Sequence, residues 1–129
     1  MVHFIKISKT DLLKTKLTAI FYRSLSGNEP VREWLQSLSK TDKKFLGTNI
    51  QMVQFGWPIG MPLVKHLADD LWEVRSNLTN GRTARILFFM YKNTMVLLHW
   101  FIKKQQKTPR IDLQIAKNRK KEIETGNLL

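Results

Sequence analysis

The sequence predicts an α/β fold of the α+β kind: a small, twisted, mostly antiparallel sheet with two helices packed on one face and a third helix at the C-terminal end. Two observations predict it. Residues 71–109 hold three consecutive β-rich runs separated by short turn signals, and residues 29–56 hold two apolar stripes at helical spacing. A chain of 129 residues, 43% of them hydrophobic, has the size and apolar content of a single domain, 1–129.

The sheet is predicted from its turns as much as from its strands. Asn80-Gly81 separates the first two β-rich runs, and Lys92-Asn93 separates the second from the third. Asn-Gly between such runs is a strong hairpin signal, because the turn needs residues that adopt positive φ. The predicted strands are 71–78, 82–92 and 94–102, preceded at 17–22 by LTAIFY, a β-branched and aromatic run that also favours a strand.

Two helices are predicted between the first strand and the hairpins, at 29–39 and 41–56. We expect Asn28 to cap the first, with Pro30 in its first turn, and Thr41 to cap the second. The apolar stripes are Val31, Trp34, Leu35 and Leu38 in the first helix and Leu46, Ile50, Val53 and Trp57 in the second. The short link between the helices implies an antiparallel pair.

The remaining segments are a loop, a last helix and an N-terminal extension. Residues 58–70 contain Pro and Gly and are predicted as a loop. Thr108 is expected to cap a C-terminal helix that Pro109 opens and whose second half is mostly charged and solvated. The apolar stripe of that helix is short and consists of Ile111, Ile115 and Ala116. Residues 1–16 match no clear element and are treated as an extension of the domain.

The charge balance is strongly basic. The chain has 22 Lys and Arg against 10 Asp and Glu, a formal net charge of +12. Such a charge attracts nucleic acid, a membrane surface or an acidic protein. The absence of Cys excludes a disulfide framework and a Cys-ligated zinc site, and it fits a reducing compartment. No apolar run approaches the roughly 20 residues of a membrane span, and lysines interrupt the N-terminal segment where a signal peptide is apolar. We therefore expect a cytoplasmic protein without a membrane partner.

Several chemistries lack the residues that they need. The chain has no Gly-rich phosphate loop, its carboxylates are few and scattered, and His3, His66 and His99 lack metal-ligand spacing. We therefore expect neither a metal nor another cofactor. His99 lies within an apolar strand, where a packed, hydrogen-bonded imidazole is the ordinary outcome and a functional role is the alternative.

Arg75 and Arg85 lie on adjacent strands of the first hairpin, and the length of the turn decides whether they share a face. A two-residue loop at 80–81 pairs residue 75 with 86 and puts the arginines on opposite faces. A three-residue loop at 79–81, with Gly81 left-handed, pairs 75 with 85 on one face. Like charges directly opposite each other repel unless an anion lies between them. The shared face would therefore indicate an anion site, and the other interpretation is a solvated outer face of the sheet.

Three lysines follow the third predicted strand: Lys103, Lys104 and Lys107. Lysines at the end of a strand are common and carry little weight alone. Together with the two strand arginines they bring five cations to one sheet edge. Fixed cations stabilise the negative charge that gathers in the transition state of phosphodiester cleavage. We therefore expect the substrate to be a phosphodiester.

From about Leu17 to Glu124 the sequence resembles the phage-derived, HigB-like branch of the RelE/ParE toxin superfamily. The matching stretches are SGNEPVREWLQSL at 26–38, GMPLVKHL at 60–67, LWEVR at 71–75 and LLHWFIKKQQKTP at 97–109. The last is the most specific, because a hydrophobic strand is followed by two lysines, a third lysine and Thr-Pro. The resemblance implies a RelE-like fold and the toxin of a type II toxin-antitoxin system. RelE-like and HigB-like members cleave mRNA in the ribosomal A site, whereas ParE-like members share the fold and poison DNA gyrase.

The resemblance also implies roles for the basic residues in a metal-independent endoribonuclease. Arg75 and Arg85 would hold the phosphate, and one of Lys103, Lys104 or Lys107 would transfer a proton. Arginine remains protonated at neutral pH, whereas a lysine crowded by other cations loses its proton more readily. The 2′-OH would attack the adjacent phosphate and release a 5′-OH end. The sequence departs from the family in having two glutamines directly after the lysine pair, with no Tyr or second His beside them.

Further contacts and partners are expected on the same grounds. The residues expected to contact RNA are Lys65, His66, Arg82, Tyr91 and His99. We expect neither Arg75 nor Arg85 in the core, and we expect Arg110 and Arg119 on a solvated helix. The implied partners are the ribosome with its A-site mRNA and a cognate antitoxin, a helix-turn-helix protein with which the toxin would bind operator DNA.

Two other functions remain as alternatives. One is a ParE-like gyrase inhibitor without nuclease activity, and the other is a basic nucleic-acid-binding module. The retained basic residues favour the nuclease over the gyrase inhibitor. The lack of a recognition helix or an aromatic platform disfavours the binding module.

Overall fold

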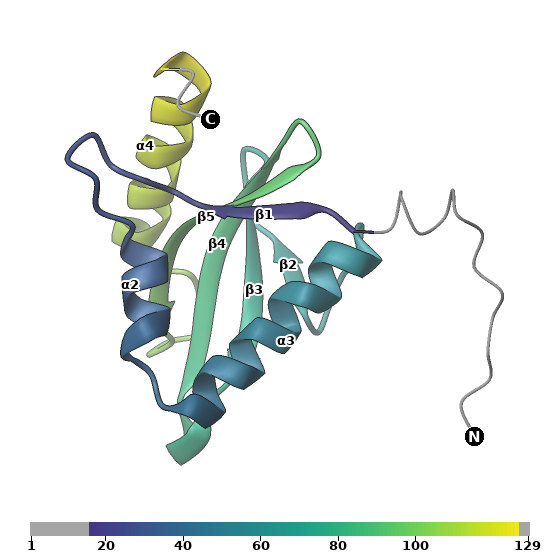
Figure 1. Cartoon of the computed structure of the whole chain (residues 1–129). Helices are drawn as coiled ribbons and strands as arrows, with labels where there is room; N and C mark the ends of the chain where they lie inside the picture. The colour runs from purple at the N-terminus through teal and green to yellow at the C-terminus, as the bar shows by residue number, and fades with distance from the viewer. Residues whose placement is uncertain (1–15, 127–129) are drawn as a thin grey trace, which may run out of the picture.

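The computed structural model describes residues 16–126 and shows a five-stranded sheet with helices on both faces (Figure 1). The strands are β1 (Thr18–Phe21), β2 (Val64–His66), β3 (Trp72–Asn77), β4 (Thr83–Tyr91) and β5 (Thr94–Ile102). The helices are α2 (Pro30–Ser37), α3 (Lys40–Gly56) and α4 (Arg110–Gly126), and a short 3-10 turn, η1 (Thr79–Gly81), joins β3 to β4. The predicted fold class is confirmed. The expected extension at 1–16 lies, apart from Lys16, outside the described residues.

The strands are ordered β1-β5-β4-β3-β2 across the sheet. β1 pairs with β5 in parallel, and the other neighbours are antiparallel, so the sheet is mostly antiparallel as predicted. The prediction of a loop throughout 58–70 is wrong, because β2 lies within it and pairs Val64 with Val74 of β3. A strand of only three residues behind Pro and Gly is held by its pairing with β3 rather than by a local pattern.

Both N-terminal helices are confirmed, but their caps differ from those predicted. α2 starts after Glu29, whose side chain makes no capping hydrogen bond, rather than after Asn28. α3 starts after Ser39, whose hydroxyl accepts a hydrogen bond from the amide of Asp42 at 3.2 Å. Thr41 therefore lies inside the first turn of α3.

The helices form two layers, one on each side of the sheet. α2 and α3 run in opposite senses, diverge from their short link and cover one face (Figure 1). Their buried side chains pack against Val74, Ile86 and Phe88. α4 covers the other face, where Ala116 and Ile123 pack against apolar side chains of β4 and β5. No helix within residues 16–126 combines the length and apolarity that crossing a membrane requires.

A bulge in β5 decides what faces α4. Leu87 pairs with His99 and the next residue, Phe88, pairs with Leu97, so Leu98 is an extra residue on β5. Leu98 is buried in the cluster beneath α4, and His99 is hydrogen-bonded to α4. The bulge thus turns two successive side chains towards the same helix.

Candidate functional site

The turn between β3 and β4 has the three-residue form. Thr79, Asn80 and Gly81 form the loop, and the amide of Leu78 donates a hydrogen bond to the carbonyl of Arg82 at 2.8 Å. Asn80 and Gly81 both have positive φ, at 62° and 70°. This turn pairs Arg75 with Arg85. The two arginines therefore lie on one face of the sheet, as the three-residue alternative predicts.

The carboxylate of Glu73 lies between the two arginines. Its Oε2 is 3.9 Å from Nε of Arg75 and 3.7 Å from Nε of Arg85. Glu73 is buried, and it also accepts a hydrogen bond from the hydroxyl of Thr108 at 3.1 Å. In the free protein, the carboxylate of Glu73 therefore offsets the repulsion between the two arginines.

The two arginines differ in exposure. Arg85 is only 5% exposed and donates a hydrogen bond to the carbonyl of Ala84 at 3.1 Å. Burial lowers the pKa of its guanidinium and the charge of Arg75 lowers it further, whereas Glu73 opposes the change. The expectation that neither arginine lies in the core is wrong for Arg85. Its burial is possible because Glu73 provides a buried counter-ion. Arg75 retains 23% of its side-chain exposure and contacts Sδ of Met61 at 3.3 Å, so it is the arginine that reaches solvent.

Two lysines extend the arginine pair on the same face. The amide of Lys103 donates to the carbonyl of Thr83 at 2.8 Å, which continues the β4–β5 pairing one step beyond the Ala84–Ile102 pair and two steps beyond the Arg85–Phe101 pair. Strand alternation puts Lys103 on the face of Arg85, where it is half-buried. Lys65 is exposed and is paired with Glu73, so it also points to this face. We call Lys65, Arg75, Arg85 and Lys103 the basic face.

A loop carries two more cations beside the basic face. Lys104 and Lys107 are exposed on the segment between β5 and α4. The end of this segment is fixed by the hydrogen bond from Thr108 to Glu73. The prediction that Thr108 caps the last helix is wrong, because α4 begins at Arg110 and the Thr108 hydroxyl donates to Glu73 instead. The loop is thereby tied to the same carboxylate that lies between the arginines.

Three of the residues expected to contact RNA lie elsewhere. Nη2 of Arg82 lies 3.0 Å from Oδ2 of Asp42, towards α3. Tyr91 is six residues from Arg85 along β4, which corresponds to about 20 Å of strand. His66 is paired with Trp72, and its ring lies 4.4 Å from that indole, so it points to the face opposite Lys65.

Asp42 fixes the β3–β4 turn to α3. Its carboxylate accepts hydrogen bonds from the amide and the hydroxyl of Thr79, at 2.9 and 3.1 Å, in addition to its contact with Arg82. The hydrogen bond from the Thr79 amide is the main cause that lowers the pKa of Asp42. Arg82 is therefore part of the anchor that holds the turn in its three-residue form.

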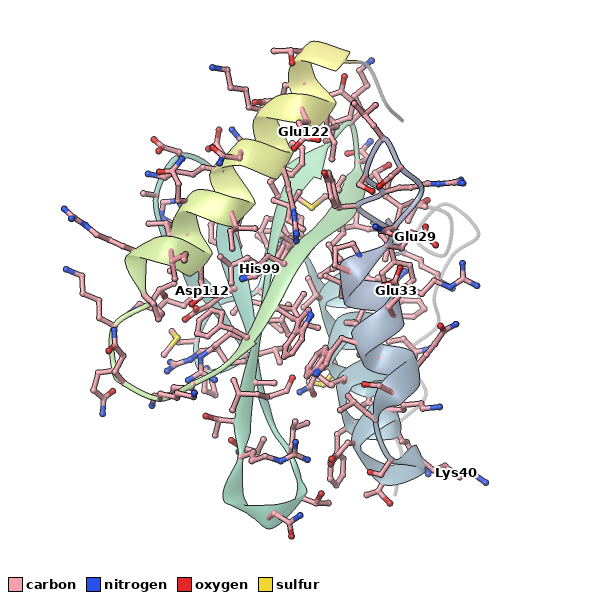
Figure 2. All side chains as sticks on the ribbon, turned by 90° about the vertical axis from the view of Figure 1, so that its left-hand side faces the viewer. Glu29, Glu33, Lys40, His99, Asp112 and Glu122 are labelled. Carbon is pink, nitrogen blue, oxygen red and sulfur yellow. The ribbon has the colours of Figure 1, made fainter. Side chains whose placement is uncertain are left out.

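His99 lies beneath the start of α4, as Figure 2 shows. Its Nε2 is 2.7 Å from Oδ1 of Asp112, and its side chain is 13% exposed. Burial lowers the pKa of His99, and the contact with Asp112 opposes that change, while the charge of Arg119 adds to it. The packed, hydrogen-bonded imidazole expected for this position is confirmed, and the contact fastens α4 to β5.

Arg119 also differs from its prediction. It was expected on a solvated helix, but it is half-buried and donates a hydrogen bond to the carbonyl of Leu98 at 2.8 Å. Its guanidinium carbon lies 5.0 Å from the centre of the Tyr22 ring, and the hydroxyl of Tyr22 donates to Glu122 at 2.8 Å. The bulge in β5 frees the Leu98 carbonyl that Arg119 binds.

Sequence reasoning missed the role of Glu73, although a signal for it exists. In LWEVR, Glu73 and Arg75 are two residues apart on a strand, and the alternation of side chains puts them on one face. The three-residue turn then adds Arg85 to that face. The contact with Thr108 has no such signal, because it depends on how the loop after β5 folds back.

These features define a class of protein: a small RelE-like α+β domain whose sheet ends in a basic face beside a lysine-bearing loop. The chain matches the family "Phage derived protein Gp49-like (DUF891)" over residues 33–121, more than half of its length, and it belongs to this family. The family is a RelE/HigB-like toxin family. The matched region includes the whole basic face and the loop after it. No curated protein matches the chain.

Proposed function

We propose that the protein is the toxin of a type II toxin-antitoxin system and that it cleaves mRNA on the ribosome. The observation that carries this proposal is the basic face itself. Four cations share one end of the sheet with the carboxylate of Glu73, and two further lysines follow on the loop after β5. The face therefore keeps a positive charge after Glu73 is counted, which suits the phosphate of a nucleic acid.

The cations of the basic face differ in solvent exposure, and we assign their roles accordingly. Arg75 reaches solvent and offers the planar fork that matches two phosphate oxygens, and Lys103 adds a charge from the neighbouring strand. Arg85 contributes from below through its charge, since it is too buried to reach a phosphate. Glu73 holds the two guanidiniums together in the absence of RNA. The phosphate contact is thus assigned to Arg75 and Lys103.

The reaction that this arrangement supports is an attack of RNA on itself. The 2′-oxygen bonds to the adjacent phosphorus while the bond to the 5′-oxygen breaks, leaving a cyclic phosphate and a 5′-OH end. A base accepts the proton of the 2′-OH, and an acid donates a proton to the departing 5′-oxygen. One of Lys103, Lys104 or Lys107 carries out one of these proton transfers. The cations of the basic face stabilise the negative charge on the non-bridging oxygens. The ribosome holds the mRNA in the geometry that this attack requires. The reaction would take place in the cytoplasm.

Cleavage on the ribosome is the direct test. The purified protein is added to ribosomes paused on a defined mRNA, and the cut site and its ends are mapped by primer extension and end-labelling. We expect A-site cuts with 5′-OH ends. Arg75→Ala should slow cleavage about a hundredfold or more, the usual loss for one transition-state charge contact. Arg110→Ala is the control, because it removes the same charge from an exposed position at the start of α4.

A gyrase assay distinguishes the main alternative. If the mRNA stays intact while supercoiling by DNA gyrase is inhibited, the protein is a ParE-like inhibitor and the nuclease proposal is wrong. Intact mRNA together with tight, sequence-tolerant binding of DNA or RNA would instead support a basic binding module.

The proposal includes a protein that keeps the toxin inactive. We expect this antitoxin to be a small helix-turn-helix protein that binds operator DNA together with the toxin. Co-expression of the protein with the product of the neighbouring gene should restore growth, and the complex should retard a fragment of its own promoter. Growth arrest that persists in the presence of that product would contradict this part of the proposal.

A further inference from the structure

A large open cavity lies beside α3, the helix that packs on the sheet face opposite α4. It is a groove of about 1080 Å³ between α3 and the end of β3, where the segment before β2 forms one wall. Its walls include Lys44, Phe45 and Met52 of α3 together with Leu63, Arg75 and Asn77. We call it the α3 groove. It plays no part in the proposed cleavage except that it ends at Arg75.

Several side chains that line the groove are apolar and open to solvent. Phe45 is 46% exposed and Met52 is 48% exposed, although both lie on a helix whose opposite side is packed in the core. Leu63 is half-buried, and it lies on the opposite wall of the groove. Exposed apolar side chains gathered along one groove are typical of a surface that binds another chain.

The charges around the groove have one sign. Lys40, Lys44 and Arg75 line it, and no Asp or Glu is among the lining residues. A partner in the groove would therefore carry carboxylates. Residues 1–15 of this chain have the wrong charge for the groove, because they contain three lysines and one aspartate. A second copy of the chain is unsuitable for the same reason, with its net charge of +12.

The groove also borders an open strand edge. β2 covers β3 only from Trp72 to Val74, and the amide of Arg75 donates to the carbonyl of Leu63 at 2.8 Å. Amides two residues apart on a strand point to the same side, so the amide of Asn77 points to the same outer edge, beyond the end of β2. Figure 1 shows how short β2 is beside β3. An uncovered edge of this kind can accept one more strand.

We propose that the α3 groove binds an extended, acidic segment of a partner protein, which pairs with the edge of β3 at Asn77. Alternate side chains of an added strand point to opposite faces of the sheet. One set would enter the groove against Phe45 and Met52 and must be apolar. The other set would lie on the side of the basic face, beside Arg75, and would carry the carboxylates. The partner segment thus alternates apolar and acidic residues.

The test uses labelled peptides and the full chain. One 12-residue peptide alternates Val or Leu with Glu, a second replaces Glu by Lys, and a third has the sequence of residues 2–13 of this chain. Binding is measured by fluorescence anisotropy at several salt concentrations, and hydrogen exchange of the Asn77 amide is followed by NMR. We expect the acidic peptide to bind, to lose affinity as salt rises and to slow exchange at Asn77.

Single substitutions locate the binding surface. Phe45→Ala and Met52→Ala should each weaken the acidic peptide about tenfold or more. Phe55→Ala is the matched control, because Phe55 is a 53% exposed phenylalanine on the same helix outside the groove. All three positions are exposed, and circular dichroism should show unchanged folding.

The other outcomes overturn the proposal. If Phe45→Ala and Met52→Ala leave the affinity for the acidic peptide unchanged, or if the peptide does not slow exchange at Asn77, the peptide is held by charge alone. Tighter binding of the 2–13 peptide would assign the groove to this chain's own segment, and a dimer that Phe45→Ala dissociates would assign it to a second copy. The absence of any binding by the acidic peptide would also refute it.

Discussion

Nε of Arg85 lies 3.7 Å from Oε2 of Glu73, and both side chains are buried. The two residues are on neighbouring strands but are not directly paired, because Arg85 is opposite Arg75 and Glu73 is opposite Leu87. This diagonal contact joins the fold to the candidate site: the carboxylate that supports the core is also the one that organises the basic face. The arginines should therefore respond differently to the same substitution.

Arg85→Ala should destabilise the protein strongly. It leaves the buried carboxylate of Glu73 with the partly exposed Arg75 as its ion-pair partner, and breaking a buried pair from one side costs up to about 3–5 kcal/mol of unfolding free energy. Arg75→Ala should cost clearly less, since Arg75 is partly exposed. Urea denaturation of the two variants, with Arg110→Ala as the surface control, measures this difference. Equal losses for Arg75→Ala and Arg85→Ala would show that Glu73 does not depend on Arg85.

Lys103→Ala should reduce mRNA cleavage, whereas Arg82→Ala should leave the rate within about twofold. Both changes remove one positive charge near the end of the β3–β4–β5 sheet. Lys103 belongs to the basic face, whereas Arg82 points to Asp42 and α3. The rates are compared on paused ribosomes at a temperature at which both variants are folded. A larger loss for Arg82→Ala would place the substrate on the α3 side of the turn.

Stability should fall on mild acidification because of His99. Burial lowers the pKa of His99 below 6.5, so the unfolded chain takes up a proton at pH values where the folded chain does not. The free energy of unfolding therefore decreases as the pH falls from 6.5 towards the folded pKa, by at most about 1.4 kcal/mol per pH unit, and is insensitive to His99 above that window.

His99→Gln tests this dependence. Urea midpoints are measured between pH 7.5 and 5.5 for both proteins, and the acid-side loss should be smaller in the variant. Asp112 and Arg119 face His99 from α4 and remain in both proteins, as do the other two histidines. Parallel pH profiles would show that His99 titrates alike in the folded and unfolded states.

Two glycine substitutions should change stability in opposite directions. Gly81 has a φ of +70° in the β3–β4 turn, so Gly81→Ala strains the backbone and should cost about 1–2 kcal/mol of unfolding free energy. Gly47 lies within α3, and a Cβ there meets no atom within 4 Å, so Gly47→Ala should add up to about 1 kcal/mol through helix propensity. Thermal unfolding of both variants checks the signs. Two changes of the same sign would contradict the conformation assigned to one of these positions.

The hairpins and the N-terminal helices were predictable because their signals are local. Asn80-Gly81 and Lys92-Asn93 occupy the positive-φ turns, and the stripes of α2 and α3 face the sheet. β2 was not predictable in this way, because Val64–His66 is too short to show a pattern and owes its conformation to β3. The bulge at Leu98 was also hidden, since it is a property of the pairing between two strands.

The sequence predicted which residues belong to the candidate site better than it predicted their burial and their contacts. The three-residue turn explains why Arg75 and Arg85 share a face, and this register could be set out from the sequence as one of two alternatives. The burial of Arg85 depends on Glu73, whose second contact is Thr108 in the loop after β5. A contact between side chains so far apart along the chain has no local signature. The same applies to Arg82, which the turn directs to Asp42.

The parallel pairing of β1 with β5 has a consequence for the order of folding. Among the strands of residues 16–126, β1 is synthesised first and its partner β5 is synthesised last, while β3, β4 and β5 follow one another as hairpins. Contacts that close such a long loop form late, and local hairpins form early. Lys103 and Thr108 follow β5, so a nascent chain has neither the β1–β5 pairing nor a complete basic face until β5 and these two residues have left the exit tunnel. A protein that acts on ribosomes in the proposed way would thus be inactive towards the ribosome that is still making it.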